Sequence, residues 1–131
     1  MNALGQHLLI ELYGCDPAVL DDVERVRDLM VGAATQLGAT IVAEFHHKFQ
    51  PYGVSVVVVI AESHLSVHTW PEYRYAAVDV FTCSQDLSPS DVLEFIVSGF
   101  RAEAVTTLEV KRGLLVARPA VPPLTETARA H

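Results

Sequence analysis

Between residues 62 and 83 the chain carries a hydroxyl, two imidazoles, carboxylates and a thiol within 22 residues. Ser63 and His68 lie in this stretch and Cys83 closes it, while Ser55 stands at the start of the preceding β-branched run. An isolated serine just past a strand is ordinarily a turn residue. Here, however, adjacent strands could bring the four side chains together. Their types are those of nucleophilic and acid–base chemistry.

One reaction open to such a serine is cleavage of its own chain. A serine hydroxyl can attack the preceding carbonyl carbon and convert the amide into an ester. Elimination then splits the chain and leaves a dehydroalanine, which hydrolyses to a pyruvoyl group with loss of ammonia. The step needs a strained peptide, an oxyanion partner and a base, and hydroxyls and imidazoles are suitable residue types. The alternative interpretation of Cys83 is a buried, inert cysteine.

Segments of strand and helix pattern must position these residues. Residues 7–13 are rich in apolar side chains and predict a strand, and Asp16-Pro17 then provides helix-start chemistry. Apolar residues at three- and four-residue steps predict a helix that ends at Gly38. They are Val19, Val23, Val26, Met30, Ala33 and Leu37.

The remaining elements are strands and a second helix. Strand patterns occur at residues 40–49, 54–61, 75–83 and 105–116. Residues 54–61 contain enough β-branched side chains for a buried central strand. Ser88-Pro89-Ser90-Asp91 resembles a capping box ahead of a helix that reaches Phe100. This order predicts an α+β fold, a two-layer sandwich in which an antiparallel-rich sheet carries two helices on one face. Dimerisation would cover the edges or the open face of such a sheet.

Length and composition limit the possible classes of protein. The 131 residues fit one domain, which we assign to residues 1–117, followed by a flexible tail over residues 118–131. Two cysteines give no disulfide framework, and we expect a cytoplasmic protein without a membrane segment. The net charge of −7 opposes nucleic acid and anionic membranes but is compatible with a cationic small-molecule substrate.

A metal site is the rival interpretation of the histidines. His64 and His68 are four residues apart, and His46 and His47 lie one strand earlier. On a helix, His64 and His68 would share a face and could bind zinc. Val67, Thr69 and Pro71 favour extended structure instead, where positions four apart are separated by about 13 Å. We therefore expect no metal.

The stretch from Glu62 to Cys83 resembles the signature of the S-adenosylmethionine decarboxylases, in the short prokaryotic form that makes its own pyruvoyl cofactor. The resemblance runs from about residue 5 to residue 113. It includes Gly5-Gln6-His7-Leu8-Leu9, Gly38-Ala39-Thr40-Ile41-Val42 and Phe49-Gln50-Pro51-Tyr52-Gly53-Val54-Ser55. It implies cleavage between Glu62 and Ser63, which yields chains of 62 and 69 residues, the second capped by a pyruvoyl group derived from Ser63.

The resemblance also implies roles for individual residues. Ser55 and His68 would assist self-processing, and Cys83 would be the catalytic acid. Phe49 would stack on adenine and Glu72 would bind the ribose hydroxyls, with Tyr52 and Trp70 as packing residues or pocket walls. The partner implied is a second copy of the chain, in a homodimer with sites near the interface.

The implied reaction is decarboxylation of S-adenosylmethionine, whose product supplies aminopropyl groups for spermidine and other polyamines. The substrate amine condenses with the pyruvoyl ketone as a Schiff base, and the conjugated carbonyls accept electrons as carbon dioxide leaves. A thiol with an ordinary pKa of about 8.5 can return a proton to the α-carbon near neutral pH.

Three positions depart from the family pattern. Val56, Arg74 and Ser84 stand where glycine is common in the family. Added side chains near the site leave two alternatives open. One is a related pyruvoyl decarboxylase that acts on ornithine or arginine, and the other is an unprocessed regulatory homologue.

Overall fold

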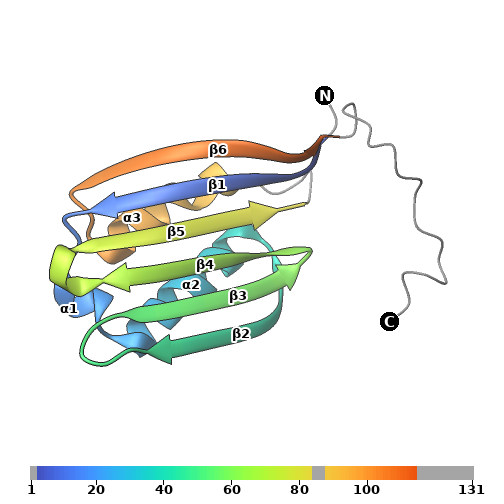
Figure 1. Ribbon diagram of the computed structural model, residues 1–131. Helices are drawn as coiled ribbons and strands as arrows, with labels where there is room; N and C mark the ends of the chain where they lie inside the picture. Colours follow the sequence, from blue (N-terminus) through green and yellow to red (C-terminus); the bar gives the residue numbers. More distant parts are fainter. Residues whose placement is uncertain (1–2, 84–87, 115–131) are drawn as a thin grey trace.

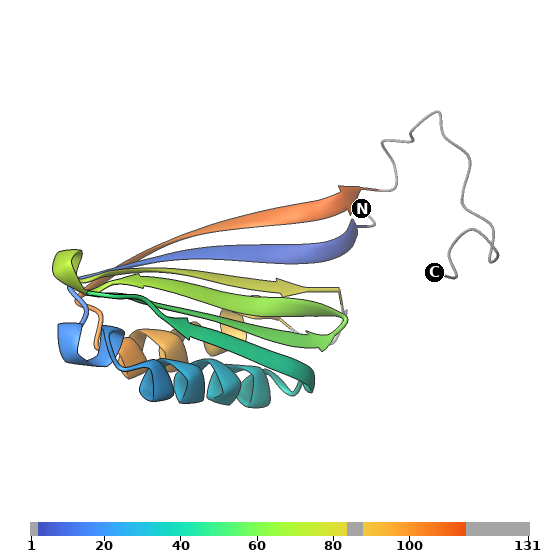
Figure 2. The same ribbon diagram turned by 60° about the horizontal axis from the view of Figure 1, so that its bottom comes forward.

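A six-stranded antiparallel sheet forms one layer of the protein, and helices cover one of its faces (Figures 1 and 2). This computed structural model describes residues 3–83 and 88–114. The strand order is β2-β3-β4-β5-β1-β6. The strands are β1 (Ala3–Tyr13), β2 (Thr40–Lys48), β3 (Val54–Ala61), β4 (Ser63–Trp70), β5 (Tyr75–Thr82) and β6 (Ala104–Leu114). The predicted α+β sandwich is confirmed.

The helix layer consists of α1 (Pro17–Leu20), α2 (Val23–Leu37) and α3 (Leu93–Phe100), with 3₁₀ turns η1 (Pro71–Tyr73) and η2 (Pro89–Val92). None of the described helices combines the length and the apolar character that a membrane span requires. The expected tail at residues 118–131 and the last two residues of the expected final strand lie outside the described residues.

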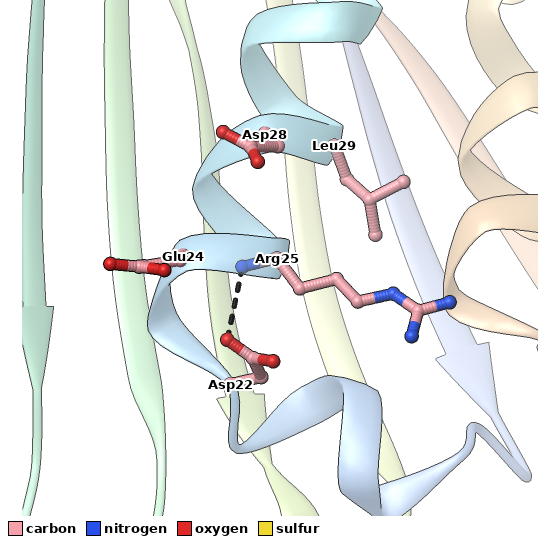
Figure 3. A pocket seen from close by; sticks show the side chains of 5 residues that line it. All are labelled: Asp22, Glu24, Arg25, Asp28 and Leu29. Carbon is pink, nitrogen blue, oxygen red and sulfur yellow. Dashed lines mark hydrogen bonds between the residues drawn. The ribbon is translucent and has the colours of Figure 1, made fainter.

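The first predicted helix is interrupted near its start. Asp21 ends α1, and Asp22 adopts an extended backbone conformation and accepts a hydrogen bond from the Arg25 amide at 3.2 Å, which begins α2 (Figure 3). An aspartate that bonds to the backbone in this way favours a helix start over a helix interior. The helix ends as expected, since Gly38 takes a left-handed conformation with φ of 83°.

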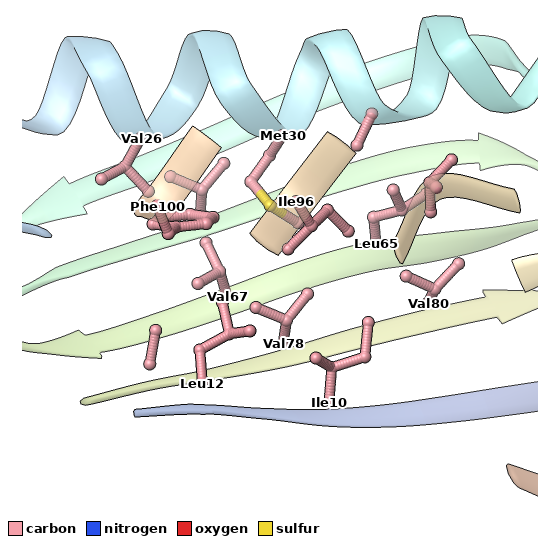
Figure 4. Close-up of a cluster of buried hydrophobic side chains, with 14 of the residues drawn as sticks. Ile10, Leu12, Val26, Met30, Leu65, Val67, Val78, Val80, Ile96 and Phe100 are labelled. Atoms are coloured by element: carbon pink, nitrogen blue, oxygen red, sulfur yellow. The ribbon is translucent and has the colours of Figure 1, made fainter. Parts of the chain in front are cut away.

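The core lies between the sheet and the helices (Figure 4). Alternate residues of the central strands point toward the helices, and in β3 these are Val54, Val56, Val58 and Ile60. They meet the apolar faces of α2 and α3, where Met30 and Phe100 are fully buried. This packing fixes which side of each strand faces away from the helices.

The other side of the sheet, which we call the open face, is not covered by any described helix (Figure 2). Apolar side chains stand on it in neighbouring strands, and Phe45 and Leu108 are more than 60% exposed. The apolar members are Leu9, Phe45, Val57, Val59, Phe81, Leu108 and Val110. Ser55 of β3 and His64, Ser66 and His68 of β4 stand among them.

Candidate active site

The first candidate pair consists of Ser55 and His68. Ser55 of β3 lies directly opposite His68 of β4 in the antiparallel register. Both residues alternate with buried core residues, so their side chains stand on the open face. Ser55 Oγ and His68 Nδ1 lie 2.7 Å apart and share a hydrogen bond. The imidazole is thereby held in a fixed orientation beside a hydroxyl.

A pocket of about 340 Å³ surrounds this pair. Phe49 and Glu72, the two residues expected to bind the substrate, line it together with Ser55 and His68. The remaining lining residues are Tyr52, Thr69 and Trp70. The ring of His47, which lies opposite Ser55 on β2, packs edge-on against Phe49 with centroids 4.6 Å apart. The structure therefore gathers four of the predicted site residues in one pocket.

The second pair consists of Ser63 and Cys83. Ser63 begins β4 and lies opposite Thr82, the last residue of β5, so Cys83 follows directly beside it. Ser63 Oγ and Cys83 Sγ are 3.1 Å apart. Ser63 has a φ of 154°, a backbone conformation that residues with a side chain rarely adopt. Such strain is what cleavage of the peptide before Ser63 would require.

The two pairs lie at opposite ends of the β3–β4 hairpin. Ser63 is opposite Ile60, and Ile60 is five residues along β3 from Ser55. At about 3.4 Å per residue, the two serines are separated by about 17 Å. The expectation that adjacent strands bring all four side chains together within one chain is therefore wrong. The register of the hairpin gives two separate pairs.

A polar network on the open face occupies the region between the pairs, and the sequence did not reveal it. Asp79 of β5 lies opposite Ser66 of β4, whose hydroxyl donates to Asp79 Oδ2 at 3.0 Å. His7 Nε2 of β1 lies 3.0 Å from Asp79 Oδ1. His7 and Asp79 are 72 residues apart in sequence, and only the pairing of β1 with β5 shows that they meet.

Two of the residues that depart from the family pattern lie away from the pocket. Val56 points toward the helices and is fully buried, whereas its neighbour Ser55 points to the open face. Arg74 ends η1 in a left-handed conformation with φ of 51°, is exposed, and is not among the residues that line the pocket. Val56 therefore does not add its side chain to the pocket. Ser84 lies outside the described residues.

The histidines make contacts other than metal ligation. His46 Nδ1 lies 2.7 Å from Glu44 Oε2, and His64 packs edge-on against the rings of His7 and Phe81. Among residues 3–83 and 88–114, no three His, Cys, Asp or Glu side chains are grouped closely enough to hold a metal ion.

A hollow of about 470 Å³ also lies on the outer surface of the helix layer, beside the first turns of α2 (Figure 3). Its lining includes Glu24, Arg25 and Asp28 but none of the residues predicted to act in the site. The pocket at the Ser55 and His68 pair is therefore the one that joins the predicted residues.

Comparisons with known proteins point to one family. The family model for S-adenosylmethionine decarboxylase matches residues 6–113. An S-adenosylmethionine decarboxylase proenzyme of Caldanaerobacter subterraneus is 56% identical over 114 residues, which cover 87% of this chain and 92% of that protein. A proenzyme of Thermodesulfovibrio yellowstonii is 50% identical over 115 residues, which cover 88% of this chain and 85% of that protein.

The fold comparison gives the same family. The crystal structure of the adenosylmethionine decarboxylase from Aquifex aeolicus matches with a TM-score of 0.81 and 35% identity, covering 87% of this chain and 94% of that one. Residues 6–113, which the family model matches, contain both pairs and the pocket. The chain belongs to the S-adenosylmethionine decarboxylase family.

Proposed function

We propose that the chain is a proenzyme that cuts itself between Glu62 and Ser63 and then decarboxylates S-adenosylmethionine with the resulting pyruvoyl group. The observation that carries this proposal is the Ser63 and Cys83 pair, whose oxygen and sulfur atoms are 3.1 Å apart at the start of β4. A pyruvoyl group formed at position 63 would therefore have the Cys83 thiol beside it as an acid. Family membership supports the same cofactor and substrate.

Self-processing starts from the Ser63 hydroxyl. Its oxygen attacks the carbonyl carbon of Glu62, the bond from that carbon to the Ser63 nitrogen breaks, and an ester forms. Loss of the α-proton of Ser63 then releases the Glu62 carboxylate, and hydrolysis of the dehydroalanine releases ammonia. The positive φ of Ser63 favours the reaction because the change of linkage relieves a rarely populated backbone conformation.

The residues present fit a pyruvoyl group at position 63, because Cys83 stands beside it and the position begins a strand of the central sheet. When formed, the group supplies a ketone that takes the substrate amine and accepts electrons as carbon dioxide leaves. Cys83 holds the proton that returns to the substrate α-carbon. Glu72 accepts hydrogen bonds from the ribose hydroxyls, and the exposed ring of Phe49 provides a face for adenine.

The functional unit in this proposal is a homodimer with composite sites. The pocket with Phe49, Glu72 and His68 is separated by about 17 Å from the Ser63 and Cys83 pair of the same chain. A substrate in the pocket would have to span this distance to meet Ser63 of its own chain, so we assign Ser63 of a second copy to the pocket. In such a dimer the two open faces would meet, and the two-fold axis would lie between them, perpendicular to the strands and midway between the two pairs. This axis would place the Ser55 and His68 pair of each copy over the Ser63 and Cys83 pair of the other copy.

The open face supports this contact. Its apolar side chains form a patch on β2, β3, β5, β1 and β6 that polar side chains interrupt at β4, and monomeric proteins rarely expose so many apolar side chains on one face. The network of Ser66, Asp79 and His7 lies between the two pairs, near the position of the axis. A second copy would bury the patch and complete two sites at once.

The first experiment is an intact-mass spectrum of the purified protein. We expect two chains that divide between Glu62 and Ser63, the larger of them lighter by one ammonia than hydrolysis alone would give. Release of carbon dioxide from carboxyl-labelled S-adenosylmethionine, with ornithine and arginine in parallel, then tests the substrate. Val56 and Arg74, which raised the alternative substrates, lie outside the pocket. A chain that stays whole during incubation would refute the proposal and favour a regulatory homologue.

A further inference from the structure

The loop between β2 and β3 carries two residues of the substrate pocket, Phe49 and Tyr52. Both side chains are exposed, at 44% and 56%. A second hollow of about 540 Å³ shares Tyr52 and Glu72 with the pocket and is also lined by Asp21. Because the side chains of Phe49 and Tyr52 are exposed, apolar packing contributes little to the position of the loop.

Polar contacts from Lys48 and Asp21 hold the loop instead. Lys48 Nζ donates to the Phe49 carbonyl at 2.6 Å and lies 3.0 Å from Asp21 Oδ1. The same Asp21 oxygen accepts a hydrogen bond from the Gly53 amide at 2.9 Å. Within the loop, the Phe49 amide donates to the Gly53 carbonyl at 2.8 Å. One ion pair therefore fixes the first and the last residue of the loop.

The ion pair is itself attached to the rigid part of the fold. Asp21 follows Leu20, whose carbonyl accepts a hydrogen bond from the buried Thr69 hydroxyl at 2.7 Å. Thr69 Oγ1 in turn accepts from the Val54 amide at 2.9 Å. Since Thr69 also lines the pocket, the end of α1 is tied to β3 and β4 at the base of the site.

We propose that Asp21 and Lys48 are positioning residues that hold the Phe49–Gly53 loop in its binding conformation and thereby set the affinity for the nucleoside part of the substrate. Neither residue is among those that line the pocket containing Ser55 and His68, so they act through Phe49 and Tyr52. This inference rests on the proposed function. The hydrogen bond from Gly53, with a smaller effect of Lys48, lowers the pKa of Asp21, so the carboxylate is ionised at neutral pH.

The test compares Asp21→Ala and Lys48→Met with Asp22→Ala. Asp22 is the neighbouring aspartate and caps α2 through the Arg25 amide, and it is among the residues of the hollow on the helix layer. All three variants should process fully by mass. The first two should raise KM about tenfold, or ~1.4 kcal/mol, with kcat within about twofold of the unaltered protein, while Asp22→Ala leaves KM unchanged.

Hydrogen exchange gives a readout that does not depend on activity. Amides of residues 49–54 should exchange faster in Asp21→Ala and Lys48→Met but not in Asp22→Ala. Because Asp21 and Lys48 act as a unit, the double variant should have a KM and a rate of loop exchange no higher than those of the more strongly affected single variant. Unchanged exchange in the loop, or an equal rise of KM in all three variants, would overturn the inference. If the unaltered protein releases no carbon dioxide, the proposed function fails, and exchange alone decides whether the ion pair orders the loop.

Discussion

The proposed composite sites lead to a quantitative expectation for mixed dimers. In a dimer of a His68→Ala chain with a Cys83→Ala chain, one site receives both substitutions and the other receives neither. Neither variant should be active alone. Random pairing makes half of all dimers mixed, and each mixed dimer has one intact site of two, so activity should recover to about one quarter of the unaltered level.

The magnitude follows from the separation of the pairs. If one chain supplied a whole site, every site in the mixture would contain a substitution, and activity would stay near zero. The separation of about 17 Å between Ser55 and Ser63 favours the proposed composite site over a site within one chain, and the composite site predicts recovery.

The assay uses co-expressed variants with different affinity tags, so that mixed dimers are isolated by two purification steps. Carbon dioxide release per dimer should then be about half that of the unaltered dimer. The mass spectrum should show the pyruvoyl-capped chain from the His68→Ala subunit, whose Ser63 meets the intact His68 of its partner. Purified mixed dimers without activity would refute the composite site.

Four further outcomes can be checked. In the uncut Ser63→Ala chain at fixed concentration, Arg74→Gly should raise the free energy of unfolding in urea by about 0.5–1 kcal/mol, because glycine tolerates a φ of 51°. In the same background Phe100→Ala should destabilise by about 3–5 kcal/mol, because it empties a fully buried site. Cys15 should resist alkylation at pH 8 until the protein unfolds, since burial raises its pKa to about 11. Folding lowers the pKa of Asp21, so the ionised carboxylate stabilises the folded protein above the pKa of the unfolded state. This stabilisation is lost as the pH falls through the pKa of the folded state. The free energy of unfolding of Asp21→Asn should therefore change less with pH below about 4 than that of the unaltered protein.

Local patterns located five of the six strands and their inward faces, whereas residues 63–70, which form β4, were expected only to be extended. The three- and four-residue spacing of Val26, Met30 and Ala33 marked the buried side of α2, and the β-branched run at 54–61 marked a central strand. The break between α1 and α2 at Asp21 and Asp22 was not predicted, because the apolar spacing continues through it and hides the helix cap at Asp22. The hydrogen bond from Asp22 to the backbone outweighs the continuity of the pattern.

The register of the sheet was beyond the reach of sequence patterns. Alternation assigns Ser55 and His68 to a face but does not say which residues lie opposite each other. The hairpin turns through Ala61 and Glu62, which lack the glycine or asparagine that signals a two-residue turn, so its register was not readable. The separation of the two pairs, the network at Asp79 and the contact of Asp21 with the loop all depend on long-range pairing.

The strand order has a consequence for the mature protein over its lifetime. The cut proposed after Glu62 would leave β1, β2 and β3 in one product and β4, β5 and β6 in the other, and in the sheet β1 would then lie between two strands of the other product. The products interlock through backbone hydrogen bonds and do not need a covalent link to stay together. Once unfolded, however, they can reassemble only by an encounter of two separate chains, so refolding becomes concentration-dependent. The precursor folds as one molecule, whereas the enzyme made from it keeps its structure chiefly by unfolding slowly.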